Sequence, residues 1–287
     1  MEKNQQEKKN QGANFSSRVD ARPRAARRWW PNISAAVDVL IALIVFVGIW
    51  QLVYYLHVRP SFLLPSPETV LNRFVTLTQR GILGTAVFAT MWRLVIGFAL
   101  AVSLGLAIGL LMVTFRRFGR MMSSFSVGLQ SFPSIAWVPF AILLVGLNDY
   151  GIIFVMVISS VFSMMLSTYS GIRNIPPIYI KAAKNMGAKR LSLFANVMLP
   201  GSMPSLMTGL KQAWSFSWHA LIGAEILMAS VGLGAVLSNG ADFARMDQIM
   251  AAMITIFFIG LIADRLIFSR LEDRVRASRG LLNQIQI

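Results

Sequence analysis

Residues 176–200 read PPIYIKAAKNMGAKRLSLFANVMLP, and this polar stretch lies between two apolar runs of membrane length. It is the longest polar interruption in the second half of the chain. We call it the basic knob. Its cations are Lys181, Lys184, Lys189 and Arg190, and Arg173 precedes it.

The pattern within the basic knob predicts two short helices joined by a glycine. Pro176 and Pro177 suit a first helical turn, because the fixed φ of proline fits that position. Gly187 can adopt the left-handed conformation that often ends a helix. A second helix is expected over residues 189–197, ended by Pro200 and Gly201. Its apolar face would carry Leu191, Phe194, Ala195 and Met198.

Two short amphipathic helices held rigidly between membrane spans suit docking into a groove of a partner. The alternative is a basic amphipathic loop that lies on the inner leaflet and is attracted by anionic lipid. That alternative requires neither Gly187 nor the Leu199-Pro200 pair at their positions.

Composition indicates a polytopic membrane protein. The chain has 287 residues, of which 55% are hydrophobic and 14% charged, with a mean hydropathy of +0.61. Soluble domains carry about 25% charged residues. The net charge of +15 is attributed to cytoplasmic loops and tails, not to nucleic-acid binding. The absence of cysteine excludes disulfides and thiolate metal sites, and two histidines are too few for a histidine metal cluster.

Six membrane-spanning helices are expected, which makes the fold class an all-α membrane protein. They are placed at residues 33–56, 94–113 (within the longer apolar run 82–115), 123–145, 152–169, 206–228 and 248–268. A short helix is predicted from Pro67, after Ser66, to about Leu77, and residues 230–247 read as a glycine-rich connection. We assign residues 1–32 to a disordered basic tail, 33–271 to the membrane domain with a loop at 172–201, and 272–287 to a second tail.

The distribution of charge predicts the topology. With both termini in the cytoplasm, most of the 27 Lys and Arg residues fall on the cytoplasmic side, including those of the basic knob. The outer side holds Arg59, Arg73, Arg80 and Arg245. Arg93 and Lys211 remain within apolar stretches.

A stripe of small residues occurs in the second span, at Gly97, Ala101, Gly105 and Gly109. Every fourth residue of a helix lies on the same side, so another helix can approach this stripe closely in lipid. We interpret it as a packing surface without chemistry.

The fifth span is the least lipid-like. Its positions at i, i+4, i+7, i+11 and i+14 share one helix face and hold Lys211, Ser215, Trp218, Ile222 and Glu225. His219 is a third ionisable group. A charge at membrane depth costs at least ~2.5–3.5 kcal/mol on insertion scales, so this span is expected to line a path or a subunit interface. The alternative is structural, with Lys211 and Glu225 reaching opposite interfaces and His219 bonded to a neighbouring helix.

Two further places are assigned to the path. Pro133, in the third span, frees backbone carbonyls that are tolerated at membrane depth only against protein or water, so this span and Trp137 are placed facing the interior. For Arg93 we favour a structural pairing or a role in an outer gate over substrate binding.

No nucleotide site or catalytic constellation is apparent. A phosphate-binding loop needs G-x-x-x-x-G-K-[ST], and no such run occurs; the glycines at 232, 234 and 240 have no following lysine. We therefore expect a non-catalytic chain that binds no metal or cofactor. If ATP drives transport, another chain must bind it.

The basic knob resembles the EAA loop of the membrane subunits of ABC importers. In those proteins the loop forms coupling helices that sit in a cleft of the cytoplasmic ATPase. The resemblance carries this docking role to Lys181, Ala182, Ala183, Lys184, Gly187, Ala188, Leu199 and Pro200. The family usually has a glutamate where this chain has Lys181, so an ion pair made by that glutamate does not form here.

Other segments resemble the permeases for nitrate, alkanesulfonate, taurine and bicarbonate, and the resemblance extends over about residues 60–274. These segments are LQSFPSIAWVP at 129–139, Thr208-Gly209-Leu210, Ala224-Glu225, Gly232-Leu233-Gly234 and Asp264-Arg265. The run GLKQAWSFSW at 209–218 is similar to that of permeases assigned to sulfonates or nitrate.

The resemblance implies the fold of a type I ABC importer transmembrane domain in a bacterial inner membrane. Two copies would form the path, two ATPase subunits carrying ATP and Mg would dock below, and an extracytoplasmic binding protein would deliver a small anion. Membrane lipid would surround the chain, and nucleic acid is no partner. Selectivity would lie mainly in the binding protein.

Two other classes of function remain as alternatives. An ion-coupled secondary transporter would use intramembrane carboxylates and inverted repeats, but Glu225 is the only carboxylate well inside an expected span. A membrane enzyme or scaffold would need a residue set that the sequence does not show.

Overall fold

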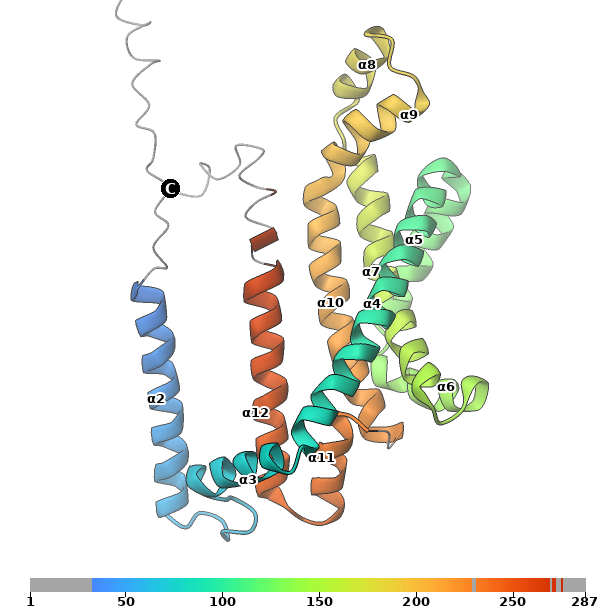
Figure 1. Cartoon of the computed structure of the whole chain (residues 1–287). Coiled ribbons are helices and arrows are strands. Elements are labelled where there is room, and N and C mark those ends of the chain that lie inside the picture. The colour runs from blue at the N-terminus through green and yellow to red at the C-terminus, as the bar shows by residue number, and fades with distance from the viewer. Residues whose placement is uncertain (1–32, 229–230, 269, 272–274, 276–287) are drawn as a thin grey trace, which may run out of the picture. The chain divides into compact units, whose positions relative to one another are not determined.

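A computed structural model describes residues 33–228, 231–268, 270–271 and 275, and every regular element in these residues is a helix (Figure 1). The chain divides into two units, residues 1–53 and 54–287. Apart from residue 275, the tails expected at 1–32 and 272–287 lie outside the described residues.

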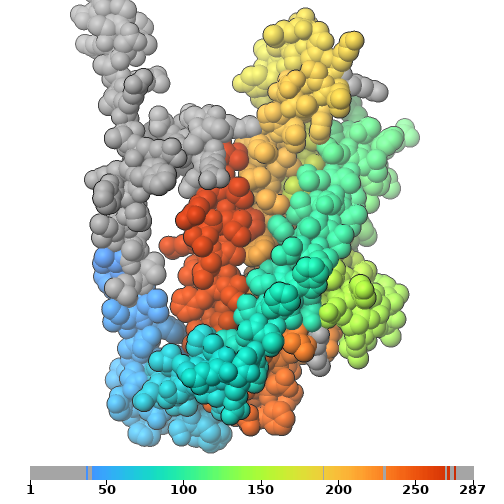
Figure 2. All heavy atoms as spheres, viewed as in Figure 1, coloured from blue at the N-terminus to red at the C-terminus, as the bar shows by residue number. Residues whose placement is uncertain are grey.

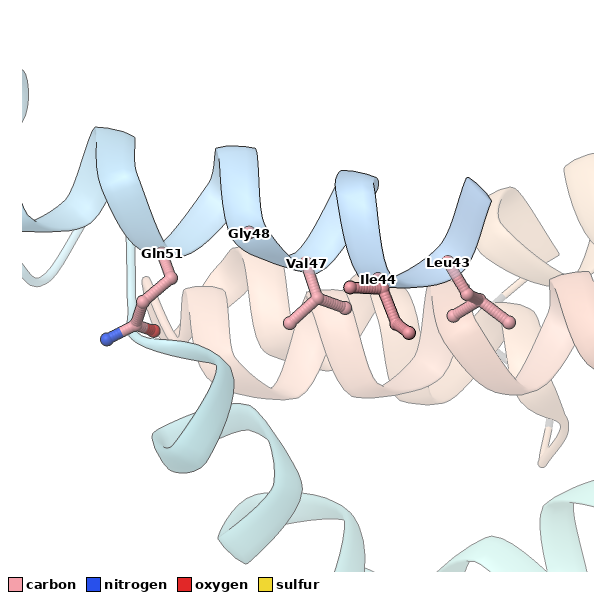
Figure 3. Close-up of a pocket in the computed structure, with 5 residues that line it drawn as sticks. All are labelled: Leu43, Ile44, Val47, Gly48 and Gln51. Atoms are coloured by element: carbon pink, nitrogen blue, oxygen red, sulfur yellow. The ribbon is translucent and has the colours of Figure 1, made fainter. Parts of the chain in front are cut away.

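Helix α2 (Ile33–Tyr55) makes up the described part of the first unit and coincides with the first expected span. Leu43, Ile44, Val47, Gly48 and Gln51 follow one another along one side of the helix, where they line an open hollow (Figure 3). Most of the side chains described on α2 are apolar and exposed. Such a surface suits hydrocarbon better than water.

The second unit begins with the short helix α3 (Pro67–Gln79), which confirms the helix expected from Pro67. The side chain of Ser66 caps it by accepting a hydrogen bond from the amide of Thr69 at 3.2 Å. Val70 and Leu77 are buried. Arg73 pairs with Asp247 at 2.6 Å, and Asp247 lies at the start of α12 (Met246–Ala263), so this ion pair joins α3 to α12.

Three long helices form the centre of this unit: α4 (Ile82–Thr114), α7 (Asp149–Arg173) and α10 (Leu199–Met228). The small-residue stripe of α4 packs against α7, as expected. A Cβ atom on Gly105 would lie 2.7 Å from Cβ of Met164, and a Cβ atom on Gly109 would lie 2.8 Å from the carbonyl oxygen of Met165. The two backbones therefore approach as closely as glycine permits.

The contact between α7 and α10 is equally close. A Cβ atom on Gly171 would lie 2.7 Å from Cβ of Ser205, and Gly209 leaves no room for a Cβ atom beside Ser167. Ser163 donates a hydrogen bond to the side-chain carbonyl of Gln212 at 2.9 Å. Consequently α4, α7 and α10 form a layer with little free space between its members.

The third expected span is broken. Helix α5 (Arg116–Gln130) is followed by the 3₁₀ turn η1 (Ser134–Trp137) and by α6 (Val138–Val145), and the chain bends by 101° between the two halves. The span expected over residues 123–145 is therefore not one continuous helix. Pro133 stands at the break, where its ring and missing amide hydrogen prevent continuation of α5.

The connection expected at residues 230–247 is largely helical. It contains α11 (Leu233–Asp242) and leads into α12 (Met246–Ala263), which continues as the π-helix η3 (Asp264–Phe268). The glycines of α11 serve close packing, since Gly234 lies against Glu225 and Gly240 against Ile249. The composition suggested a loop because glycine is common both in loops and where helices pack closely.

Length and apolar composition identify three described helices that could cross a membrane: α4, α7 and α12 with η3. The number rises to five if the bent pairs α5–α6 and α10–α11 each count as one crossing. In α2 the apolar segment Ile41–Tyr55 is shorter than these criteria require. The six expected spans are thus only partly identified in this way.

Candidate functional site

The first helix of the basic knob is α8 (Pro177–Asn185), and Gly187 follows its C-cap residue Met186, as the predicted stop requires. Gly187 has φ +85°. Its amide donates to the carbonyl of Lys184, and the amide of Ala188 donates to the carbonyl of Ala183, both at 3.0 Å. These two hydrogen bonds form a Schellman motif, which requires a left-handed residue at Gly187.

The second part of the basic knob does not end where expected. Helix α9 (Arg190–Leu193) passes through the π-helix η2 (Phe194–Met198) directly into α10, which begins at Leu199. Pro200 and Gly201 are therefore inside the helix and do not stop it. The wide π turn before Pro200 accommodates the missing amide hydrogen of this proline. A Cβ atom on Gly201 would lie 3.0 Å from the side chain of Ile175, so a larger residue would have little space there.

The surface of the basic knob combines exposed apolar and basic side chains. Ile178, Tyr179, Met186 and Leu191 are 61–87% exposed, and Lys181, Lys184 and Lys189 are exposed as well. Figure 2 shows the basic knob as a projection at one end of α10. Exposed apolar side chains gathered on a rigid projection are typical of a binding surface.

Four polar and charged side chains gather near the end of α10 away from the basic knob, and all of them except Asp149 are buried (Figure 1). We call Thr90, Arg93, Asp149 and Glu225 the ion cluster. The guanidinium of Arg93 donates to Oε1 of Glu225 at 2.6 Å and approaches Oδ1 of Asp149 at 2.9 Å. Thr90 donates to the carboxylate of Glu225 at 3.0 Å. Glu225 is 0% and Arg93 4% exposed.

The first turn of α11 is bonded to the same cluster. The amide of Gly234 donates to Glu225 at 3.0 Å, and the amide of Leu233 donates to Thr90 at 2.9 Å. Arg93 also donates to the carbonyl of Val231 at 2.6 Å. A Cβ atom on Gly232 would overlap the carboxylate of Glu225. The ion cluster therefore joins α4, α7, α10 and the start of α11.

The other residues expected on the face of α10 are separated from Glu225. Lys211 pairs with Asp264 at 3.3 Å, and both side chains are 43% exposed. Ser215 is exposed. Trp218 and His219 line an open hollow between α10, α11 and α12, together with Leu237, Met253, Phe257 and Gly260. We call it the α10–α12 hollow.

The residues expected in the third span lie at the break between α5 and α6. Pro133 is exposed, and Trp137 packs edge-on against Phe132 with ring centroids 5.4 Å apart. Ile135 lies beside α10, 3.5 Å from a Cβ position on Gly223. The break therefore touches α10 between the levels of Trp218 and Glu225.

Sequence reasoning missed the partners of Arg93, Glu225 and Lys211. Thr90 and Asp149 were not assigned to a site, and Asp264 was not connected with Lys211. Asp149 carried a usable signal, because it opens a helix directly after a tight turn and a membrane-embedded arginine needs a carboxylate nearby. No group of three or more potential metal ligands occurs among the described residues.

Comparison with known proteins identifies the relatives of the chain. A putative ABC transporter permease protein of Methanocaldococcus jannaschii is 33% identical over 225 residues, covering 76% of this chain and 84% of the relative. The putative aliphatic sulfonates transport permease protein SsuC of Escherichia coli is 34% identical over 218 residues, covering 76% and 83%. The bicarbonate transport system permease protein CmpB of Synechococcus elongatus is 28% identical and covers 89% and 95%.

The fold is similar to that of a chain in the inward-facing MetNI methionine ABC transporter. The TM-score is 0.52 at 18% sequence identity, over 66% of this chain and 96% of the other. Residues 101–277 match the family model described as the binding-protein-dependent transport system inner membrane component. The chain therefore belongs to this family of ABC transporter permeases, whose members are non-catalytic membrane components.

Proposed function

We propose that two copies of this chain form the translocation path of an ABC importer for a small anion of the sulfonate, taurine, nitrate or bicarbonate class. An extracytoplasmic binding protein delivers the anion, and two ATPase subunits with ATP and Mg drive the transport. The basic knob carries the proposal, because it is a rigid projection with exposed apolar and basic side chains. Relatives named for sulfonates and bicarbonate support the anion class.

The proposed topology has six crossings and both termini in the cytoplasm of a bacterial inner membrane. The crossings are α2, α4, the pair α5–α6, α7, the pair α10–α11, and α12. The membrane domain is residues 33–271, between tails at 1–32 and 272–287. The excess of Lys and Arg supports a cytoplasmic position for the basic knob, where an ATPase can reach it.

The docking surface proposed for the ATPase is the basic knob from Lys181 to Pro200. Met186 is 87% exposed and follows α8 directly. Met186→Glu places a carboxylate on this surface without changing a buried contact, and desolvating an unpaired charge in an interface is unfavourable. We expect at least about tenfold less partner ATPase to co-purify with the variant, which corresponds to about 1.4 kcal/mol.

Leu71→Glu is the matched control, because Leu71 on α3 is 62% exposed, and α3 lies outside both the basic knob and the proposed crossings. It should retain ATPase association at the wild-type level. Equal association of the ATPase with both variants and with the wild type would contradict docking through the basic knob.

The proposed path follows one face of α10 and the break between α5 and α6. Its residues are Pro133, Trp137, Lys211, Ser215, Trp218 and His219, with Arg93 and Glu225 at the end away from the basic knob. Ser215→Trp should block uptake by filling the path. Ser124→Trp, a change of the same size at an exposed position of α5, is the control.

Uptake is measured in proteoliposomes that contain the complete importer, with taurine, ethanesulfonate, nitrate and bicarbonate offered separately. Uptake of one of the sulfonates or inorganic anions supports the class. Undiminished uptake by Ser215→Trp would show that the path lies elsewhere.

A further inference from the structure

Burying the ion cluster costs free energy, so a contribution to stability alone does not account for its presence. Moving an ion pair out of water costs several kcal/mol per ion, and replacing such a pair by apolar side chains is often neutral or stabilising. Glu225 nevertheless sits fully buried, beside a guanidinium that bonds two carboxylates and a backbone carbonyl. Directional bonds of this kind fix positions, which apolar contacts do less strictly.

The element fixed by these bonds is α11. Its first amides are donors without partners inside the helix, and those of Leu233 and Gly234 are bonded to Thr90 and Glu225. The contact is also too close for any side chain at positions 232 or 234. Hydrogen bonds and close packing together thus fix the position of the start of α11 against α4 and α10.

The same bonds complete a rigid connection that starts at the basic knob. Helix α10 continues from α9 and η2 without a break as far as Met228. Along its length α10 packs closely on α7, and α7 packs closely on α4. Leu237 of α11 lines the α10–α12 hollow beside Trp218 and His219.

We propose that Arg93 and Glu225 are positioning residues that make α11 move as one piece with α4, α7 and α10. A displacement of the basic knob then changes the α10–α12 hollow, because the ion cluster makes α11 move together with α10. This inference rests on the proposed docking of the ATPase at the basic knob. It assigns the ion cluster to transmission of motion and not to contact with the anion.

Hydrogen exchange of the assembled importer in lipid nanodiscs tests the proposal, with ATP and vanadate as the ligand. In the wild type, adding ATP and vanadate should change exchange both in the peptide of α8 and in the peptide of α11. In Glu225→Gln the α8 peptide should respond as before, while the response of the α11 peptide is lost. Exchange at the amide of Gly234 should rise about tenfold or more, since its acceptor is no longer charged. Exchange at the amide of Leu233 should rise less, because its acceptor is the hydroxyl of Thr90.

Three controls separate transmission from general destabilisation. A peptide from the middle of α7 should keep its wild-type exchange, because that part of the α4–α7 contact is made at Gly105 and Gly109, away from the ion cluster. Glu68→Gln makes the same chemical change at an exposed position of α3 and should behave as the wild type. Thr90→Val, which keeps the side-chain shape, should give a partial loss of the α11 response.

Removing both charges provides a further test. Arg93→Met combined with Glu225→Met should recover thermal stability relative to either single variant, because no unpaired charge remains buried. The α11 response to ATP and vanadate should stay lost. Recovery of that response together with stability would overturn the proposal, as would a wild-type response in Glu225→Gln.

The outcomes also distinguish the inference from the function on which it rests. A wild-type importer in which the α8 peptide responds and the α11 peptide does not would overturn only the transmission role. A wild type in which the α8 peptide shows no response to ATP and vanadate would overturn docking at the basic knob, and the inference with it.

Discussion

Substitution of single glycines on α4 tests how the centre of the fold is held together. A Cβ atom on Gly105 would lie 2.7 Å from Cβ of Met164 and 3.0 Å from the carbonyl oxygen of Val161. Neither obstacle can rotate away, because a Cβ atom and a carbonyl oxygen are fixed by the backbone of α7. Gly105→Ala therefore forces the two helices apart.

The size of the effect follows from the overlap. Carbon atoms in contact are about 3.5–4.0 Å apart, so α4 and α7 must separate locally by roughly 1 Å. Overpacking of this kind typically costs about 1–3 kcal/mol. Gly97→Ala should cost less, because the nearest atoms are Cε and Sδ of the flexible Met156 side chain. Gly84→Ala is the matched control on the same helix, since nothing lies within 4 Å of its Cβ position.

Thermal unfolding of the purified protein in detergent, followed by tryptophan fluorescence, measures these differences. At about 2–4 °C per kcal/mol, a loss of 2 kcal/mol lowers the Tm of Gly105→Ala by about 4–8 °C. Gly97→Ala should show a smaller decrease and Gly84→Ala none. A Tm for Gly105→Ala equal to that of Gly84→Ala would refute the assignment of the stripe as the α4–α7 contact.

Three further predictions concern the ends of helices and one surface ion pair. Gly187→Ala places a Cβ atom at φ +85°, which costs about 1–2 kcal/mol in the left-handed region, and should weaken co-purification with the partner ATPase more than Gly187→Asn does; equal losses would argue against a conformational cause. Lys211 and Asp264 should show a coupling energy below about 1 kcal/mol in a double-mutant cycle with alanine, since both side chains are 43% exposed, and a larger value would indicate desolvation. Ala244 has φ +49°, so Ala244→Gly should raise the Tm by relieving up to about 1 kcal/mol of strain, and a lower Tm would contradict this.

Local patterns predicted the parts of the fold that depend on single residue types. The left-handed turn at Gly187 followed from the properties of glycine, and the start of α3 from Ser66 and Pro67. The packing role of the small residues in α4 followed from their occurrence at every fourth position. In each case the residue type fixes the backbone or the distance of approach, so no knowledge of distant contacts was needed.

Features that depend on distant contacts were predicted less well. Pro133 signalled freed carbonyls but not a bend of 101°, since the angle depends on what the halves of the broken helix pack against. Pro200 was read as a stop because a π turn before it is not visible in the sequence. The pairing of Arg93 with Glu225 joins positions 132 residues apart, and no local pattern indicates which carboxylate an arginine will meet.

The pathway residues remain a prediction. Lys211, Ser215, Trp218 and Glu225 share one side of an ideal helix, yet they have different surroundings in the folded chain. Ser215 is exposed, whereas Glu225 is enclosed by α4 and α11. Helical spacing predicts which residues point the same way, and the neighbouring elements decide which of them reach an open space.

The close fit of Gly232 and Gly234 against Glu225 bears on how the family can diverge. A methyl group at either glycine would collide with the glutamate or with the backbone beside it. Conversely, the glutamate fits only where the glycines leave this space and an amide is available to bond it. The three positions should therefore be inherited together. A natural relative with alanine at the first glycine should carry a shorter side chain in place of the glutamate, and the arginine of α4 should then be exchanged in the same lineage.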